Sequence, residues 1–349
     1  GGGMRLAWMV SFGALACQTG GEPSEAPVVP RTSTEVVVPS DGLDLEGTFV
    51  VPEHRADESV PVVVLVHGSG PNSRDVPVSG QLNLAFGFTF DLFAELSDGL
   101  VDEGIAVLRY DKRTCTSANG CRNDYPPPDA NVTVDDFLTD AAAAVGFAAS
   151  QTDIDPDRVF VVGHSQGATL VPPLLRDVPE LDGGVLLAGP FRTIDALLRI
   201  QLDSSRELLL ELGIPEKQAD AQLATLSELV GDVEAIAGGT FEGTSTGGGS
   251  VAFWESWIDL GIDARDAALA TDDVLLVIGG DYDWNVPVEE VDAWEAHLDG
   301  SDSYGIATLG CVTHALNCIS EPDWQAVTPA DIGRGLDPRV VELVAAPMR

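Results

Sequence analysis

One short stretch constrains the fold of this chain more than any other. Residues 158–170 contain a run of apolar residues, the sequence GHSQG at 163–167, and the first turn of a helix. A serine between two glycines at this spacing is typical of a sharp strand-to-helix turn that exposes a nucleophilic hydroxyl. Gly163 and Gly167 suit such a turn, because a β-carbon at either position would collide with the adjoining strand or helix. The stretch therefore predicts Ser165 as a nucleophile.

An acyl-transfer nucleophile also needs donors for the oxyanion that forms on the substrate. The predicted turn leaves the backbone N–H of Gln166 at a helix N-terminus, where it can bind an anion. A second donor is expected in the loop HGSGP at 67–71, and the best candidate is the backbone N–H of Ser69. We interpret His67 as a brace of that loop and His164 as lining the turn, without a proton-transfer role for either.

A serine hydroxyl needs a base, and the base needs an orienting acid, in the chain order Ser, acid, His. His314 is the best candidate base because it directly follows the last predicted strand. His297 lies within a helix of mixed polarity, so we interpret it as a surface residue. The sequence GDYDWNVP at 280–287 offers two acids. Asp283 is favoured, and Asp281 is the alternative, which could instead brace the turn.

Around this turn, apolar runs alternate with helical spacing. The eight expected strands are at 34–39, 43–51, 60–66, 105–110, 159–162, 184–188, 274–279 and 304–309. Helices are expected at 88–103, 134–150, 167–177, 287–298 and 338–345, with Pro172 and Pro173 ending or kinking the third. The charged sequence RYDKR at 109–113 is interpreted as a brace at a strand end. The pattern predicts an α/β fold, with an eight-stranded, mostly parallel sheet and helices on both faces.

The alternation stops between about residues 191 and 268, where the pattern is mostly helical apart from a Gly-rich stretch at 238–249. We interpret this segment as a helical lid inserted into the α/β framework, with a flexible seam at the glycines. Its aromatic residues Phe253, Trp254 and Trp257 are candidates to bind substrate by facing an acyl pocket. The alternative is that they only anchor the lid to the core.

The composition indicates which partners are excluded, and the N-terminus indicates the cellular compartment. A net charge of −38, from 18 basic and 56 acidic residues, argues against nucleic acid as a partner. It suits either a saline setting or simply an acidic exported protein. Residues 1–17 have a basic residue, a short apolar run and ALAC at 14–17, which predicts an export signal with a lipobox-like end. Cys17 is then the lipidation site of a periplasmic or outer-membrane lipoprotein, and plain secretion is the alternative. Residues 18–33 are expected to form a disordered linker, and 34–349 the folded domain.

The other four cysteines form two local pairs along the chain. In an exported chain this arrangement predicts two disulfides, Cys115–Cys121 and Cys311–Cys318. The second pair brackets His314 and would fix its loop, and buried free thiols are the alternative. The spacing of a CxxC zinc site is absent, and the predicted chemistry requires no metal or organic cofactor.

Several of these segments resemble the bacterial α/β-hydrolases of the esterase, dienelactone-hydrolase-like and serine-aminopeptidase-like group. The similar segments are 67–71 with Arg74 and Asp75, 104–111, 163–167, 186–190 and 280–287. The resemblance implies a serine hydrolase of the α/β-hydrolase fold that acts on small-molecule esters, most consistent with a carboxylesterase for small to medium acyl groups. Two alternatives stay open. One is a serine peptidase of the prolyl or aminopeptidase kind, with an acidic anchor in the lid. The other is a non-catalytic binding protein on a hydrolase scaffold.

Overall fold

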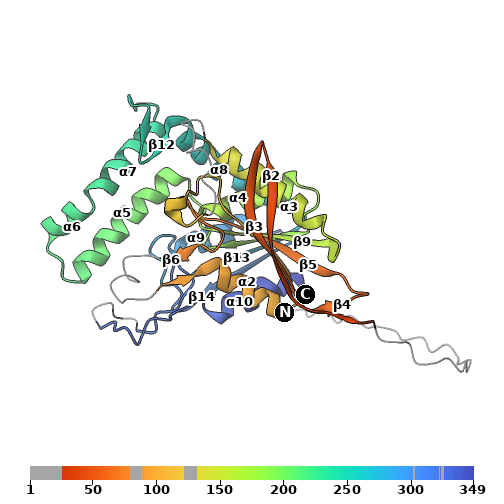
Figure 1. Ribbon diagram of the computed structural model, residues 1–349. Helices are drawn as coiled ribbons and strands as arrows, with labels where there is room; N and C mark the ends of the chain where they lie inside the picture. The colour runs from red at the N-terminus through yellow and green to blue at the C-terminus, as the bar shows by residue number, and fades with distance from the viewer. Residues whose placement is uncertain (1–25, 79–88, 122–131, 302, 322, 324–325) are drawn as a thin grey trace, which may run out of the picture.

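An eight-stranded, mostly parallel sheet forms the centre of the molecule (Figure 1). The computed structural model describes residues 26–349 except 79–88, 122–131, 302, 322 and 324–325. The strand order is β14-β13-β10-β9-β5-β8-β3-β2. The six strands from β14 to β8 run parallel to one another, whereas β3 pairs antiparallel with both β8 and β2. The strands are β2 (Thr32–Ser40), β3 (Leu43–Val51), β5 (Val60–Val66), β8 (Ala106–Tyr110), β9 (Ile154–His164), β10 (Gly183–Leu187), β13 (Val274–Gly280) and β14 (Tyr304–Leu309). The predicted fold class is confirmed.

Helices cover both faces of this sheet, and a central strand such as β5 is therefore apolar along its whole length. All seven residues of β5 are buried, and they alternate between the two layers of the core. Val62 and Val64 pack in the layer of α3 (Val134–Ala149), α4 (Gln166–Asp177), α8 (Val251–Ala270) and α9 (Val288–Leu298). Val63 and Leu65 pack in the layer of α2 (Leu92–Asp102) and α10 (Pro338–Ala345) (Figure 1).

The predicted disordered linker at 18–33 is wrong for its described part, 26–33. The short strand β1 (Val28–Val29) pairs antiparallel with β4 (His54–Arg55), and β2 already begins at Thr32. Arg31 between them forms ion pairs with Asp98 and Asp102 of α2. Backbone hydrogen bonds to β4 and the ion pairs of Arg31 hold this segment against the domain despite its polar composition. Residues 1–25, with the predicted export signal and Cys17, lie outside the described residues.

Other boundaries differ from the predictions in ways that packing explains. Helix α4 ends at Asp177 as predicted and continues through Pro172 and Pro173, so of the two expected effects of the prolines, ending the helix is wrong. Each proline removes one helical hydrogen bond, but ten consecutive residues of α4 are buried against the sheet and α8, and this packing keeps the helix intact. Helix α2 begins only at Leu92, after a short hairpin of β6 (Pro77–Val78) and β7 (Phe90–Asp91).

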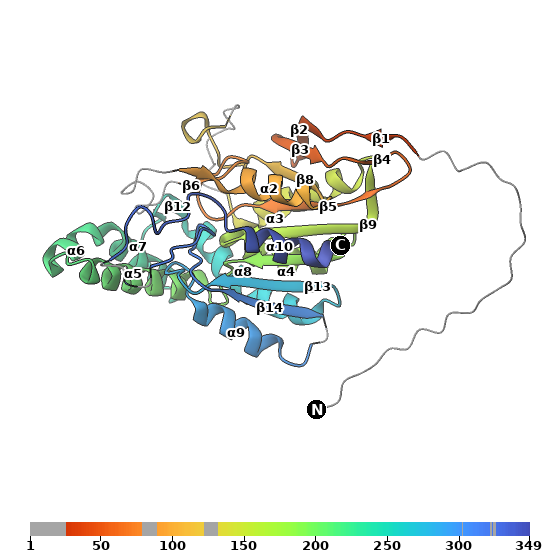
Figure 2. The ribbon, with the colours of Figure 1, turned by 90° about the horizontal axis from the view of Figure 1, so that it is seen from below.

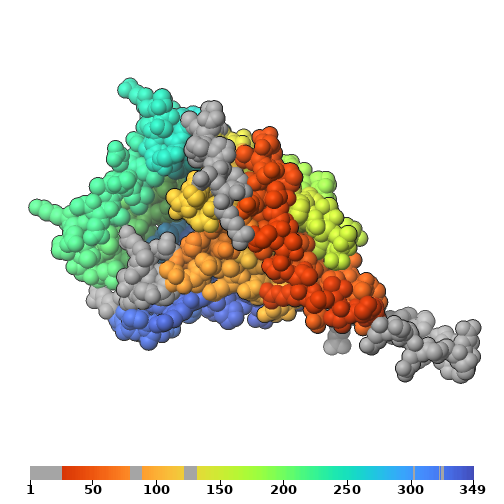
Figure 3. Space-filling model, viewed as in Figure 1, coloured from red at the N-terminus to blue at the C-terminus, as the bar shows by residue number. Residues whose placement is uncertain are grey.

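The segment 191–268 consists of α5 (Ile194–Glu211), α6 (Glu216–Gln222), α7 (Ala224–Ala237) and α8, with a small hairpin of β11 (Ser245–Thr246) and β12 (Gly249–Ser250). Helices α5 to α7 form a lobe beside the sheet, and Figure 3 shows a hollow between this lobe and the rest of the molecule. Figure 2 shows the lobe extending beyond the ends of the strands. The Gly-rich stretch is folded, because Gly247 and Gly248 make the turn of the hairpin with φ of 56° and 81°. In the described ranges, no helix is both long and apolar enough to cross a membrane.

Candidate active site

Ser165 stands on the turn between β9 and α4, in a backbone conformation that side chains rarely adopt, with φ 56° and ψ −119°. The two glycines are sterically required there. A β-carbon on Gly163 would lie 2.1 Å from the carbonyl oxygen of Gly167, and one on Gly167 would lie 2.2 Å from the carbonyl oxygen of Val66. The turn is held to the neighbouring strand by a hydrogen bond from the Ser165 N–H to the Leu187 carbonyl. The hydroxyl is thereby presented at the carboxyl edge of the sheet.

A chain of hydrogen bonds joins the three residues that the sequence singled out. His314 Nε2 lies 3.1 Å from Ser165 Oγ, and His314 Nδ1 lies 2.8 Å from Asp283 Oδ2. Asp283 is buried, and its Oδ1 accepts hydrogen bonds from the N–H groups of Asn285 and Val286, both at 2.8 Å. Because Asp283 accepts the Nδ1 proton, His314 is left with a lone pair on Nε2 that faces the serine hydroxyl.

Asp281, the alternative acid, supports the histidine loop from a different side. Its Oδ1 accepts a hydrogen bond of 2.6 Å from the Cys311 N–H. Arg339 of α10 donates to the Gly310 carbonyl at 2.9 Å, so both charged residues hold the beginning of the loop. The His314 ring donates its hydrogen bond to Asp283, and Asp281 acts as the brace of the turn.

A disulfide closes the histidine loop. Cys311 and Cys318 are bonded, with their α-carbons 4.8 Å apart, and the predicted Cys115–Cys121 bond is also present. The carboxylate of Asp337 lies near Cys311 and Cys318, at a spacing that could suit a metal ion. Because both sulfur atoms are committed to the disulfide, they cannot act as thiolate ligands there. The bond therefore serves the loop and not a metal.

His164 contacts the candidate base directly, which the sequence did not reveal. Its Nε2–H donates a hydrogen bond of 2.8 Å to the backbone carbonyl of His314, and the two rings lie 4.9 Å apart. Burial and the neighbouring His314 lower the pKa of His164 to about 3, so its ring is neutral. His67 is also buried and neutral, with its pKa lowered to about 3 mainly by burial, and it packs edge-on against Tyr110.

The two candidate oxyanion donors belong to two segments that adjoin the serine, the start of α4 and the loop after β5. The Gln166 N–H is the first of α4, where a helix has no internal acceptor for it. Gly68 comes so close to the nucleophile that a β-carbon on it would lie 3.2 Å from Ser165 Cβ. The next residue, Ser69, is exposed, and in the described part of the chain no acceptor takes its N–H. Both N–H groups are therefore available to a ligand at Ser165.

The segment 109–113 does more than brace a strand end. Lys112 is buried, and its Nζ donates hydrogen bonds of 2.8 Å to the Gly68 carbonyl and to Gln166 Oε1. Its ammonium also lies 4.3 Å from the centre of the Phe137 ring. Burial lowers the pKa of Lys112 to about 7, while the charge of Asp140 opposes that shift. The only hint in the sequence is that Lys112 is one of just two lysines.

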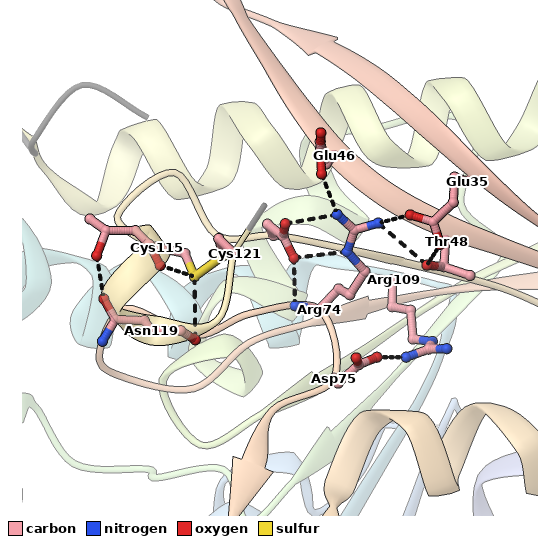
Figure 4. Close-up of polar contacts among 11 residues, drawn as sticks. Glu35, Glu46, Thr48, Arg74, Asp75, Arg109, Cys115, Asn119 and Cys121 are labelled. Atoms are coloured by element: carbon pink, nitrogen blue, oxygen red, sulfur yellow. Dashed lines mark hydrogen bonds and ion pairs between the residues drawn. A yellow bond between two sulfur atoms is a disulfide. The ribbon is translucent and has the colours of Figure 1, made fainter. Parts of the chain in front are cut away.

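The rest of that segment behaves as the predicted brace, as Figure 4 shows. Arg74 donates through Nε and Nη2 to both carboxylate oxygens of Asp111, at 2.9 and 2.8 Å. The same guanidinium also binds Glu46 at 2.9 Å. Arg109 forms an ion pair with Asp75. These paired charges fix the end of β8 and the loop after β5 to each other.

The predicted substrate-binding aromatics pack as anchors of α8. Trp254 and Trp257 are buried and stacked, with ring centres 5.6 Å apart, and Phe253 meets Phe137 of α3 edge-on. Trp254 Nε1 donates to the Thr246 carbonyl at 3.0 Å. Among the described residues, none of the hydrogen bonds or ring contacts of these three side chains involves the serine, histidine or aspartate above. The structure thus uses them to attach α8 to the core.

A cavity of about 330 Å³ lies instead between α5 and the loop that carries the acid. Its lining is Ser204, Glu207, Leu208, Glu211, Asp281, Tyr282, Asp283 and Trp284. The side of the cavity that the lobe supplies is therefore partly acidic.

His297 is only partly exposed, although its helix suggested a surface residue. Its ring lies against Phe191 and Trp294, and its Nε2–H donates to the Arg265 carbonyl at 3.0 Å. The sequence missed this packing because Phe191 comes from the start of the inserted segment, far away along the chain. His314 is therefore the histidine that the fold brings to Ser165.

Known proteins are similar to this chain in sequence or in fold. Esterase EstD from Thermotoga maritima is 27% identical over 293 residues, which are 83% of this chain and 61% of the relative. The chain therefore spans less than two thirds of that relative's length. Among solved structures, Est1E from Butyrivibrio proteoclasticus with bound ferulic acid has a TM-score of 0.51 at 16% identity, covering 80% of this chain and 91% of that one.

A second solved structure is an acylaminoacyl peptidase in complex with Z-Gly-Gly-Phe-chloromethyl ketone. It has a TM-score of 0.52 at 15% identity and covers 85% of this chain and 39% of that one. At such low identity both structures are similar to this chain in fold alone. The model of the alpha/beta hydrolase family matches residues 63–339. Because that match includes the nucleophile turn, the acid and the histidine, we conclude that this chain belongs to the alpha/beta hydrolase family.

Proposed function

We propose that this protein is a serine hydrolase of carboxylic esters, and that Ser165, His314 and Asp283 form its catalytic triad. The observation that carries the proposal is the chain of hydrogen bonds from Ser165 Oγ through the imidazole to the buried carboxylate. The similar protein EstD is named an esterase, which supports esters as the substrate class.

In the proposed mechanism, Ser165 Oγ attacks the ester carbonyl while His314 Nε2 takes the hydroxyl proton. The buried Asp283 carboxylate stabilises the imidazolium and keeps its ring in place. The oxyanion of the tetrahedral intermediate accepts hydrogen bonds from the N–H groups of Ser69 and Gln166. His314 then gives the proton to the leaving alkoxide. A water molecule, activated by the same imidazole, hydrolyses the acyl-enzyme.

The cavity between α5 and the loop of Asp283 suggests the size of the substrate. We propose small to medium acyl esters, because the cavity of about 330 Å³ is at the lower end of the range for ligand pockets. One observation favours a second candidate, a serine peptidase. Glu207 and Glu211 of α5 face the same cavity as Asp283, and a carboxylate there could bind the ammonium group of a peptide N-terminus.

We also propose that the protein is exported, and that a lipid on Cys17 tethers it to a membrane. Two observations support export. The first 17 residues have the composition of a signal segment, and the folded domain contains two disulfides, which persist in oxidising compartments. Metabolic labelling of expressing cells with a radioactive fatty acid tests the tether. Label in the wild-type protein that Cys17→Ala removes is expected, and an unlabelled wild type would contradict the tether.

A substrate panel tests the catalytic proposal. p-Nitrophenyl esters of increasing acyl length are compared with aminoacyl-p-nitroanilides, using the wild type, Ser165→Ala and His314→Ala. Both variants should lose at least about a thousandfold in kcat, because they lack the nucleophile or the base. The matched control is Ser227→Ala on the exposed side of α7, which should retain wild-type kcat.

The panel separates the three possible functions. Ester turnover that depends on Ser165 supports the esterase, and faster turnover of the anilides supports the peptidase. A wild type that turns over neither substrate, and whose serine does not react with a fluorophosphonate, would be a non-catalytic binding protein. Substantial turnover by Ser165→Ala would refute the proposed nucleophile.

A further inference from the structure

Lys112 occupies an unusual place for a lysine. It is the second residue after β8 and is only 5% exposed. The small cavity that it borders is lined by Val66, His67, Tyr110, Phe137, Asp140 and Leu170. An ammonium group loses much of its hydration in such a place, so it must gain hydrogen bonds to be tolerated. The role of Lys112 therefore depends on the two groups that accept its hydrogen bonds.

The first acceptor belongs to the peptide group of one candidate oxyanion donor. Lys112 Nζ donates to the Gly68 carbonyl, and the N–H of the same peptide group is that of Ser69. In a planar trans peptide the C=O and N–H bonds point in opposite directions, so holding the carbonyl toward the interior turns the N–H outward. Asn72 Nδ2 adds a second hydrogen bond to the same carbonyl at 3.1 Å. The two hydrogen bonds to the Gly68 carbonyl thus fix the orientation of the Ser69 N–H.

The second acceptor is the side chain of the residue that supplies the other donor. Gln166 Oε1 accepts from the same Lys112 Nζ at 2.8 Å, and the Gln166 backbone N–H is the first of α4. One ammonium group therefore bonds to both segments that carry the candidate donors, although these segments follow different strands, β5 and β9.

We propose that Lys112 is a positioning residue that holds the two oxyanion donors, the N–H groups of Ser69 and Gln166, in one fixed geometry around Ser165. The inference rests on the proposed function and adds a residue to it. A cation bonded to the Gly68 carbonyl also polarises that peptide group, which strengthens the hydrogen bond that the Ser69 N–H can donate. Lys112 itself does not touch the substrate.

The charged and titratable groups around Lys112 fit this role. Asp140 faces it but is already held by Arg113 with two hydrogen bonds of 2.7 Å and by Ser40 at 2.6 Å. His67 is neutral, and burial raises the pKa of Tyr110, which stays protonated. Asp140 is thus the nearby counter-charge, and Lys112 remains free to bond to the two loops.

The first experiment compares Lys112→Met with Arg113→Met by p-nitrophenyl ester turnover. Arg113 is the matched control because it is an adjacent buried cation that contacts Asp136 and Asp140 and neither loop. Lys112→Met should lower kcat by about ten- to a hundredfold, less than the loss of an oxyanion donor itself, with KM changed less than about twofold. Its affinity for phenylboronic acid, which forms a tetrahedral anion on the serine, should fall by a similar factor. Arg113→Met should keep kcat and lose stability.

Equal kcat in Lys112→Met and the wild type would overturn the proposal, and so would an equal loss of kcat in both variants. The function is judged separately, by the wild type and Ser165→Ala. If the wild type hydrolyses esters and Ser165→Ala does not, the outcome for Lys112→Met concerns the lysine alone.

A second measurement uses the wild type and needs no variant to fold. The chain has only two lysines, so a protein labelled with ¹³C at lysine Cε gives two NMR signals, and the exposed Lys217 is the internal reference. The Lys112 signal should titrate below the ordinary lysine pKa of 10.5. Phenylboronic acid should shift only the Lys112 midpoint upward, because the bound anion favours the ammonium form. A Lys112 midpoint that the boronate leaves unchanged would contradict coupling to the oxyanion site.

Discussion

Replacing Asp283 with Asn tests how the acid controls the tautomer of His314. The carboxylate Oδ1 accepts the N–H groups of Asn285 and Val286, so an Asn amide would keep its oxygen at that position. Its NH₂ group would then face His314 Nδ1, which must release its proton to accept the hydrogen bond. The ring proton moves to Nε2, which points at Ser165 and can no longer take the serine proton.

The expected loss is large although the substitution barely changes volume. A triad held in the wrong tautomer loses about 10⁴ in kcat, which corresponds to about 5.5 kcal/mol of transition-state stabilisation. The unfolding free energy should change by no more than about 1 to 2 kcal/mol, because the two backbone N–H groups keep their acceptor. The structure therefore predicts a folded protein with almost no turnover.

Asp281→Asn is the matched control for this prediction. Within the part of the chain that the structure describes, the Asp281 side chain accepts a hydrogen bond only from the Cys311 N–H, and an Asn oxygen can replace that acceptor. We expect kcat to stay within about threefold of the wild type. Saturating p-nitrophenyl acetate measures kcat, and circular dichroism during urea unfolding measures stability. An Asp283→Asn variant with more than about 1% of wild-type kcat, or an equally damaging Asp281→Asn, would refute the reasoning.

Two more predictions concern stability. A double substitution of Cys311 and Cys318 by Ser should lower the unfolding free energy by about 2.5 kcal/mol, because the bond no longer closes a short loop in the unfolded chain. It should also reduce kcat, because the bond no longer fixes the loop of His314. The same change at Cys115 and Cys121 should lower stability with wild-type kcat, and an unchanged kcat in the first variant would count against a catalytic role of that disulfide. Burial lowers the pKa of Lys112 from 10.5 to about 7, so between these values the unfolded chain binds one more proton than the folded one. The unfolding free energy should therefore rise by up to about 1.4 kcal/mol per pH unit from pH 7 to 10, and an undiminished slope in Lys112→Met would contradict this.

The nucleophile turn could be predicted from the sequence because its constraint is local. Gly163 and Gly167 leave no room for a β-carbon, so the pattern of residues and the geometry of the turn imply each other. The parallel sheet could be predicted for a similar reason, since a strand covered on both faces needs an unbroken apolar run such as Val60–Val66. The pairing of the cysteines also followed from short spacing along the chain.

Other features depended on residues that are distant in sequence. The choice between Asp281 and Asp283 needed the position of His314, which comes from another loop about thirty residues later. The roles of Trp254 and Trp257 needed the location of α8 against the sheet, because a lid aromatic and a core aromatic look alike in sequence. The start of the folded domain needed β4, the partner strand of β1, which follows it by about twenty-five residues.

The sequence by itself determined the fold class, the candidate nucleophile and the order of its partners, because short-range sterics and the periodicity of apolar residues impose these features. Only the tertiary structure decided which buried polar groups meet. Lys112 reads as one charge in a basic and acidic cluster, and its significance appears when β5, β8 and β9 bring Gly68 and Gln166 to its ammonium group. A buried charge is tolerated only with its hydrogen-bond partners, and those partners come from strands that lie far apart in the chain and side by side in the sheet.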